Sequence, residues 1–384
     1  MRVGIISAER NCYSTKRFSE VGKTRGHEVR VIHPGQVSIL LRTKQSDLFV
    51  KNVKAKQIDA IIPRIESGSN PLKLAVLRQF EQLGTFCLNT SSAIAIAHDK
   101  LRTAQILSRN RIPTPDSAWV LNDSDIPKVI EKLGGAPIVI KVLSGSQGSG
   151  VILAESDKVA KAIIEALQMA GHAVLLQRFI RESAGQDIRA FVVGDKVVAS
   201  MRRIAQGDDF RSNIHKGGRA EPLELDEHSQ NVAVRASHAV GLRIAGVDLI
   251  ESHEGPLVLE VNSSPGLQGI EESTKVDVAT EIYKHLEEEV NFPEYDLKEV
   301  LPLGKGYAVL QIAIHEESPF RDKSLENIDF RDRGLHLLRL SRGGLTIPFP
   351  LKSEVLSLGD VLLFFGKKLD LMTLRGEAQN LTKP

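Results

Sequence analysis

Apolar and polar positions alternate in blocks along the first 90 residues. The apolar blocks are short, which is typical of buried strands, and the polar blocks between them resemble helices. The apolar runs are VGII (3–6), VRVI (29–32) and AIIPRI (60–65), and the polar segments are YSTKRFSEVGKTRG (13–26) and PLKLAVLRQFEQLG (71–84). Strands that alternate with helices predict an α/β unit with a parallel sheet.

The pattern changes twice further along the chain. From Asn89, a helical pattern follows the capping residue Thr90, and Lys100 opens a second helix that the prolines after residue 112 end. Past Asn291, two prolines interrupt a charge-rich helix, and strand-like runs follow: YAVLQIAIH, LHLLRLSR and GDVLLFFG. These runs predict a separate small domain at the C-terminal end.

Two apolar runs, GVDLI (246–250) and LVLEVNSSPG (257–266), carry oxygen-bearing side chains and are joined by the turn-like segment ESHEGP. A hairpin that folds about Glu254 places Asp248 opposite Glu260, and Asn262 shares a face with Glu260 because side chains two apart point the same way. Opposed carboxylates repel unless a cation lies between them. Such ligands suit Mg²⁺ or Mn²⁺, and the alternative is a solvated sheet face.

A glycine-rich segment, PIVIKVLSGSQGSGV (137–151), places Lys141 near the end of a β-branched strand. Backbone N–H groups of such a loop can approach phosphate oxygens closely, and the lysine adds a positive charge. The helix start at Lys100 also suits phosphate. The alternative for this segment is a flexible hairpin tip.

Charged residues recur after the next apolar strand, VLLQRFI (174–180). Asp187 and Arg189 lie two apart and so on one face of a strand, and further arginines, Arg202, Arg203 and Arg211, follow. Together with a phosphate loop and a metal hairpin, these cations are what phosphoryl transfer needs. An exposed ion-pair network is the alternative for the charged residues.

The composition of the 384 residues limits the class of protein. A formal net charge of +2 argues against a dedicated nucleic-acid surface, and no run is apolar enough for a signal peptide or a membrane span. The only two cysteines, Cys12 and Cys87, lack metal spacing and fit a reducing cytoplasm. No nucleophile signature is present, and the single tryptophan, Trp119, is expected to fill a core gap.

In this order, the motifs resemble the ATP-grasp superfamily and, within it, the RimK family of α-L-glutamate ligases. The resemblance covers about residues 1–290. It rests on HDKLRT (98–103), the glycine-rich segment, RRIAQGDDFRSNIHKGG (202–218) and GVDLI followed by LEVNSSPGLQGIE. It implies an α/β and α+β ATP-grasp fold, in which an α/β pre-ATP-grasp domain precedes two α+β lobes that clasp ATP.

The resemblance also implies roles for individual residues. Lysines contact the phosphates, the hinge backbone contacts adenine, and further residues line the nucleotide site: the set is Lys100, Lys141, Arg178, Phe179, Asp187, Arg211, Ser212 and Asn213. Two Mg²⁺ or Mn²⁺ ions are held by Asp248, Glu260 and Asn262. The reacting phosphoryl or carboxylate group is faced by Arg189 and Arg203. The family more often has an acidic residue at the hinge position of Arg178.

The activity so implied is an ATP-dependent ligation of acid and amino acid that releases ADP. A carboxylate is phosphorylated to an acyl phosphate, and the amino group of L-glutamate displaces phosphate. The implied acceptor is the C-terminal glutamate of a small-subunit ribosomal protein, and poly-α-glutamate is a further product. The alternatives are a ligase for a small metabolite or a carrier protein, and a non-catalytic nucleotide sensor. We expect no direct nucleic-acid or membrane partner.

The C-terminal segment resembles the TrkA-C (RCK C-terminal) regulatory domain, a small β-rich module that commonly dimerises and sometimes binds a ligand. This resemblance implies a homo-oligomer, either a dimer or a tetramer. The expected division is a pre-ATP-grasp domain, a small lobe, a large lobe, a linker and a TrkA-C-like domain, at residues 1–90, 91–175, 176–290, 291–304 and 305–384.

Overall fold

The computed structural model of the protein describes residues 1–43, 46–55, 58–66, 71–143, 150–206, 218–291, 306–328, 330, 333–342, 345–348 and 350–378. The chain divides into two compact units, Met1–Pro293 and Glu294–Pro384. Within the part of the chain that the structure describes, no helix combines the length and apolarity needed to cross a bilayer.

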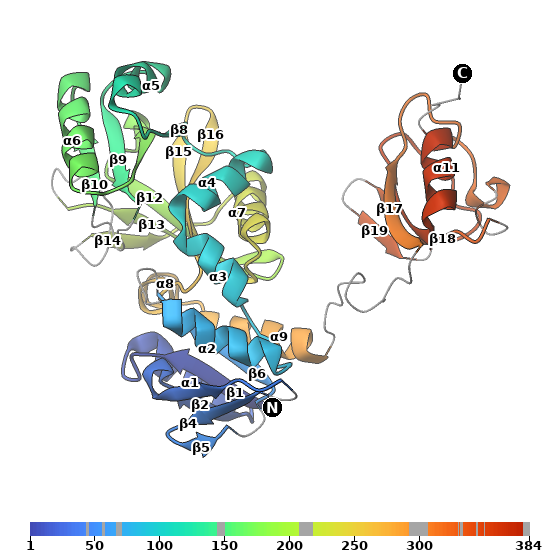
Figure 1. The fold of residues 1–384 in the computed structure, drawn as a ribbon, viewed down its shortest axis with the longest axis horizontal. Coiled ribbons are helices and arrows are strands. Elements are labelled where there is room, and N and C mark those ends of the chain that lie inside the picture. The colour runs from blue at the N-terminus through green and yellow to red at the C-terminus, as the bar shows by residue number, and fades with distance from the viewer. Residues whose placement is uncertain are drawn as a thin grey trace. The chain divides into compact units, whose positions relative to one another are not determined.

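The first unit begins with the predicted parallel sheet (Figure 1). Its strands are β1 (Arg2–Ser7), β2 (Glu28–Ile32), β6 (Ala60–Arg64) and β7 (Phe86–Cys87), in the order β2-β1-β6-β7, and its helices are α1 (Tyr13–Thr24) and α2 (Pro71–Gln82). Strand β1 is almost wholly buried, as expected for a central strand of a parallel sheet covered on both faces. A small antiparallel sheet that the pattern did not predict follows β2 and consists of β3 (Val37–Leu40), β4 (Asp47–Val50) and β5 (Val53–Lys54).

The small lobe is an antiparallel sheet covered by two helices. Its strands are β8 (Ser117–Trp119), β9 (Ile138–Val142), β10 (Val151–Ala154) and β11 (Val174–Arg178), in the order β10-β9-β11-β8, and its helices are α5 (Ile126–Lys132) and α6 (Asp157–Met169). Buried aliphatic side chains of both helices and all four strands, or their immediate ends, form its core. The expectation that Trp119 fills a core gap is wrong, because this residue lies on the edge strand β8 and is 44% exposed.

The large lobe carries the hairpin. Its strands are β12 (Gln186–Val193), β13 (Lys196–Ile204), β14 (Arg219–Pro222), β15 (Ile244–Ser252) and β16 (Gly255–Asn262), in the order β14-β13-β12-β15-β16. Helix α7 (Glu227–Val240) packs on one face, and α8 (Gln268–Thr274) and α9 (Val278–Asn291) lie between the other face and α1 (Figure 1). The helices α3 (Ser91–His98) and α4 (Lys100–Arg109) begin at Thr90 and Asp99, whose side chains accept a backbone N–H of the first turn.

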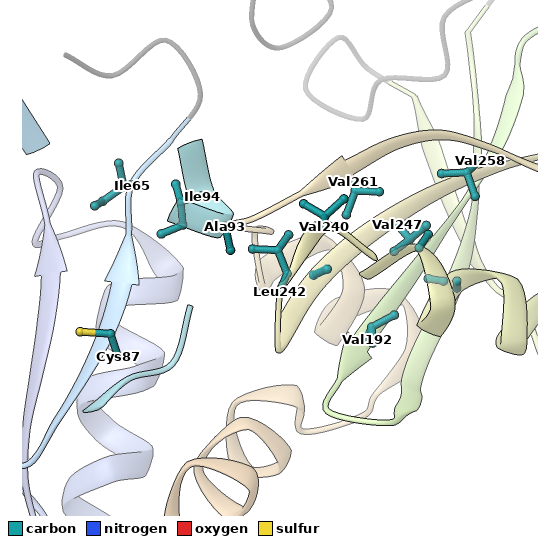
Figure 2. Close-up of a cluster of buried hydrophobic side chains, with 14 of the residues drawn as sticks. Ile65, Cys87, Ala93, Ile94, Val192, Val240, Leu242, Val247, Val258 and Val261 are labelled. Atoms are coloured by element: carbon teal, nitrogen blue, oxygen red, sulfur yellow. The ribbon is translucent and has the colours of Figure 1, made fainter. Parts of the chain in front are cut away.

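The parallel sheet and the large lobe share buried cores. In one cluster, Ile65, Cys87 and Ile94 pack in a continuous group with Leu242 and Val261 of the large lobe (Figure 2). A second cluster joins β1 and α1 to α8 and α9. Shared apolar burial of this kind fixes the two sheets relative to each other.

The second unit is β-rich, as the strand-like runs predicted. Its strands are β17 (Tyr307–Ala313), β18 (His336–Arg342), β19 (Leu345–Pro348) and β20 (Val361–Lys367), in the antiparallel order β17-β20-β18-β19, and helix α11 (Lys368–Ala378) packs against β17 and β20. The unit has its own hydrophobic core. Asp360 is fully buried there and accepts hydrogen bonds from Arg342 at 2.7 and 2.8 Å.

Candidate active site

Asp248 and Glu260 lie opposite each other in the ladder of β15 and β16, as the sequence predicted. The turn differs from the expected one: Ser252 pairs with Gly255, and a shift in register between Asp248 and Leu249 leaves Leu259 as an extra residue on β16. Asn262 shares the face of Glu260, and its Nδ2 donates to Oδ2 of Asp248 at 3.4 Å. The three predicted metal ligands therefore lie together on one face of the sheet.

Two arginines bind the carboxylate of Asp248. Arg189, which pairs with Asp248 across β12 and β15, donates from Nε to Oδ1 and from Nη2 to Oδ2, the latter at 2.9 Å. Nη2 of Arg203 lies 2.9 Å from Oδ2. Burial by itself would raise the pKa of Asp248, but the charges of the two arginines outweigh burial and hold this pKa below its ordinary value.

Arg203 also binds Asp187, so four charged groups form one cluster. The Nε and Nη2 atoms of Arg203 each donate to an oxygen of Asp187 at 2.6 Å. Burial opposes the charged form of Arg203, yet Asp248 and Asp187 together raise its pKa. We call Asp187, Arg189, Arg203 and Asp248 the arginine–aspartate cluster.

The arginine–aspartate cluster lies at one end of a sheet face, and the other end of that face is apolar. Asp187, Arg189, Phe191 and Val193 alternate along β12 and so point to the same side. Phe191 and Val193 pack into the core under α8 and α9, whereas Asp187 and Arg189 lie beyond that core. Arg202 has the opposite parity to Arg203, and its Nη1 lies 2.9 Å from Glu251 rather than in the cluster.

Lys141 brings the small lobe into this site. It lies on β9 between Val151 of β10 and Leu175 of β11. Burial lowers the pKa of Lys141, while Glu260 and, more weakly, Asp248 raise it and the charge of Lys100 lowers it further. These effects require that Lys141 lies within electrostatic reach of Glu260, Lys100 and Asp248.

Arg178, the predicted hinge residue, ends β11 and binds two other segments. Its backbone N–H donates to the carbonyl of Asp116 at 2.8 Å, and its Nη1 and Nη2 atoms both donate to Oε1 of Glu254, at 3.0 Å each. Glu254 is at the tip of the β15–β16 hairpin. The charge of Arg178 is therefore neutralised by a carboxylate that the hairpin supplies, and Phe179 follows Arg178 directly.

Arg211, Ser212 and Asn213 lie outside the described residues, as does the middle of the glycine-rich loop, 144–149. Cys12 and Cys87 are free thiols. Between residues that are described, the structure brings together Lys100, Lys141, Asp187, Arg189, Arg203, Asp248, Glu260 and Asn262.

Sequence reasoning missed Gly246. A Cβ atom at this residue would lie 2.8 Å from Cβ of Pro265 and 3.1 Å from Cδ and Nη1 of Arg189, so only glycine leaves room for the arginine that binds Asp248. A glycine inside an apolar strand often marks such a close approach, and this signal was available in GVDLI.

Comparison with known proteins decides the family. A RimK PreATP-grasp domain matches residues 1–94, a RimK-like ATP-grasp domain matches 97–286 and a TrkA-C domain matches 309–378. A probable alpha-L-glutamate ligase of Rhodopirellula baltica is 44% identical over 96% of this chain and 91% of its own length. The chain belongs to the RimK-like ATP-grasp family.

Other RimK-like proteins and ATP-grasp folds agree with this assignment. A probable alpha-L-glutamate ligase 1 of Shewanella amazonensis is 47% identical over 75% of this chain and 95% of its own. Among solved structures, the ATP-grasp ligase PsnB with minimal precursor, Mg and ADP has a TM-score of 0.60 at 21% identity, covering 75% of this chain and 98% of that one. A RimK domain protein of Sphaerobacter thermophilus has a TM-score of 0.58 at 23% identity, covering 74% and 99%.

Membership of the RimK-like family gives the fold and the class of reaction. The protein has the ATP-grasp fold with a pre-ATP-grasp domain, and its C-terminal part is a TrkA-C domain. It is an enzyme, a ligase of the ATP-grasp type, and such ligases use ATP with Mg²⁺.

Proposed function

We propose that the protein is an α-L-glutamate ligase that forms a peptide bond between the C-terminal glutamate of a protein acceptor and the amino group of L-glutamate. The proposed acceptor is a small-subunit ribosomal protein, and poly-α-glutamate is a second product when glutamate alone is supplied. The observation that carries this proposal is the meeting of Asp248, Glu260 and Asn262 with two arginines on one sheet face, within electrostatic reach of Lys141 of the small lobe.

The residues fit a site for two divalent ions. Two carboxylates and one amide group are grouped on a single face, and the Glu260 side chain is exposed, so its oxygens are open to a ligand. Asp248 has one donor at Oδ1 and three at Oδ2, so Oδ1 keeps a lone pair for an ion. Mg²⁺ keeps several ligands from phosphate or water, so three protein ligands suffice. When bound, the ions neutralise phosphate charge during transfer.

The protein's own residues position the reactants for the first step. In this proposal Lys100 and Lys141 bind phosphate oxygens, and the backbone at Arg178 and Phe179 binds adenine. Asp187 and the segment Arg211–Asn213 complete the nucleotide site. The acceptor carboxylate attacks the γ-phosphorus of ATP, the bond to ADP breaks, and an acyl phosphate forms. Arg189 and Arg203 stabilise the charge that develops on the transferred group.

The second step forms the peptide bond. The neutral amino group of glutamate attacks the acyl carbon, and phosphate leaves with the electron pair of the broken C–O bond. One proton passes from the amine to solvent. Water would hydrolyse the acyl phosphate, so the reaction needs a site from which water is excluded.

The remaining assignments complete the proposal. We place the domain boundaries at residues 90, 175, 290 and 304, and we assign homo-oligomerisation to the TrkA-C domain. The two free cysteines suit the cytoplasm. A catalytic function is preferred to a nucleotide sensor because a sensor has no need for the carboxylate pair and its arginines.

The test is a ligation assay with a defined acceptor. Purified protein is incubated with ATP, Mg²⁺, glutamate and a peptide that ends in glutamate, and the products are measured by mass spectrometry. The proposal predicts stepwise addition of glutamate residues together with ADP. ADP release only with another carboxylate would identify a metabolite or carrier-protein ligase, and tight ATP binding without turnover would identify a sensor.

A further inference from the structure

Arg64 is the last residue of β6 and has an incomplete set of partners. Its Nη1 donates to the carbonyl oxygen of Pro265 at 2.7 Å, while its Nε is buried and has no hydrogen-bond partner. Burial lowers the pKa of Arg64, but an arginine remains charged at neutral pH. A buried charge without a partner is costly, so Arg64 requires an anion.

The chain itself does not supply that anion among the residues described. Four other arginines, in or directly after β1, β2 and α1, each pair with a carboxylate: Arg2 with Asp59, Arg17 with Glu271, Arg25 with Glu287 and Arg30 with Glu28. Cys12 and Glu66 raise the pKa of Arg64, against the effect of burial. Neither makes an ion pair or a hydrogen bond with Arg64 in the described part of the chain. The unused Nε–H donor of Arg64 therefore indicates that this residue binds a ligand.

The position of Arg64 in the sheet also points to a ligand. Arg64 pairs with Ser7 at the carboxyl ends of β6 and β1. From β1 the chain passes to β2 on one side and then to β6 on the other, so the strand order reverses between β1 and β6. Open α/β sheets bind ligands in the crevice outside the carboxyl ends of strands at such a point.

The carboxyl end of β6 adjoins the proposed reaction centre. The loop Ser263–Gly266 follows β16, and Oγ of Ser264 bonds both the backbone N–H and the carbonyl of Ile65, at 3.2 and 3.0 Å. The carbonyl oxygen of Pro265 accepts the hydrogen bond from Arg64. The ring of Pro265 and the side chain of Arg189 both lie next to the place that a Cβ atom of residue 246 would take. One proline therefore separates Arg64 from the arginine that binds Asp248.

We propose that Arg64 binds a carboxylate of the glutamate substrates that is not phosphorylated, and so positions that substrate against the acyl phosphate. This inference rests on the proposed glutamate ligase activity. The guanidinium fork matches a carboxylate, and glutamate presents such a group both as the free amino acid and as the last residue of the acceptor. The shared chemistry is a carboxylate next to the reacting centre, and kinetics distinguish the two sources.

The experiment measures KM for ATP, for glutamate and for a glutamate-terminated peptide in the wild type, Arg64→Ala, Arg64→Lys and the control Arg30→Ala. Arg30 is a surface arginine of the same sheet. Removing Arg64 should raise the KM of one glutamate-bearing substrate about tenfold or more and leave the KM of ATP within about twofold. The KM of Arg64→Lys for that substrate should lie between those of the wild type and Arg64→Ala, because lysine keeps the charge but cannot donate two parallel hydrogen bonds.

The substrate whose KM rises identifies the source of the carboxylate. An increase for free glutamate assigns Arg64 to the amino-acid site, and an increase for the peptide assigns it to the acceptor site. Unchanged KM values for both, or an equal loss of kcat whatever substrate is varied, would overturn the inference and leave Arg64 only as a support for the loop at Pro265. A wild-type protein that ligates no glutamate would instead remove the proposed function itself.

Discussion

Asp248 faces Glu260 because Leu259 bulges out of the ladder between β15 and β16. The turn sets Ser252 opposite Gly255, and that register, continued without a bulge, would place Leu259 opposite Asp248. Glu260 would then point to the opposite face of the sheet. Bulges next to active sites often re-aim a side chain in this way.

Glu260→Gln and Asp248→Asn should separate catalysis from stability. Glu260 is exposed and has no hydrogen bond or ion pair among the described residues, so its amide should leave the melting temperature unchanged and lower kcat at least about a hundredfold. Asp248 is 6% exposed and binds two arginines, so Asp248→Asn should also lower the free energy of unfolding by about 3 kcal/mol. Calorimetry and turnover measure the two effects. Wild-type turnover in Glu260→Gln would remove that residue from the site.

Gly246→Ala should misplace Arg189 without unfolding the protein. The added methyl group would meet Pro265 and Arg189, and we expect kcat to fall about ten- to a hundredfold. Gly266→Ala is the matched control, because a Cβ there has no atom within 4 Å. Equal activities in the two variants would show that the position of Arg189 does not limit the reaction.

Exchanging the residues of the Arg178–Glu254 ion pair should preserve the pair and the binding of ATP. Arg178→Glu puts two carboxylates together at the hinge, and we expect KM for ATP to rise a few-fold. Both side chains are partly exposed, so the pair contributes only about 0.5–1 kcal/mol. Arg178→Glu combined with Glu254→Arg should recover the wild-type KM. If the double variant is as impaired as the single one, Arg178 acts through some contact other than Glu254.

His98 should make stability depend on pH below neutrality. Burial lowers the pKa of His98 in the folded protein below its ordinary value near 6.5, so in the window between the two values the unfolded chain binds more protons. Stability should therefore fall as the pH drops through about 6.5. His98→Gln removes the contribution of His98 to the pH dependence of stability. The melting temperature of this variant should therefore decrease less than that of the wild type between about pH 7.5 and 5.5. Identical pH profiles would contradict the burial effect.

The TrkA-C domain should be dispensable for chemistry. Residues 294–384 form a unit with its own core, so a chain that ends at residue 293 should keep kcat within about twofold and change its oligomeric state. Light scattering and the ligation assay measure both properties. Loss of all ligation in a well-folded truncation would assign the domain a part in catalysis.

The pairing of Asp248 with Glu260 was predicted correctly, but from a turn that differs from the observed one. Folding about Glu254 gave the right partner for Asp248, although the turn has a different register and a bulge compensates for it. Strand parity also placed Asp187 and Arg189 on one face, because alternation is a local property.

Long-range contacts could not be predicted from the sequence. Arg203 reaches Asp248 only because β12 lies between β13 and β15. Arg64 meets Pro265 across 201 positions of the chain, where neither residue carries a local signal. Both contacts depend on sheet order and shared cores, which a hydrophobic pattern does not specify.

The most direct measurement follows isotopically labelled glutamate into a peptide that ends in glutamate, with ATP and Mg²⁺, by mass spectrometry of the wild type beside Glu260→Gln. We predict labelled peptide, one residue longer at each step, with ADP formed in equal amount by the wild type and almost no product from the variant. An unchanged peptide with the wild type, or the same product yield from both proteins, would contradict the assignment of this sheet face to glutamate ligation.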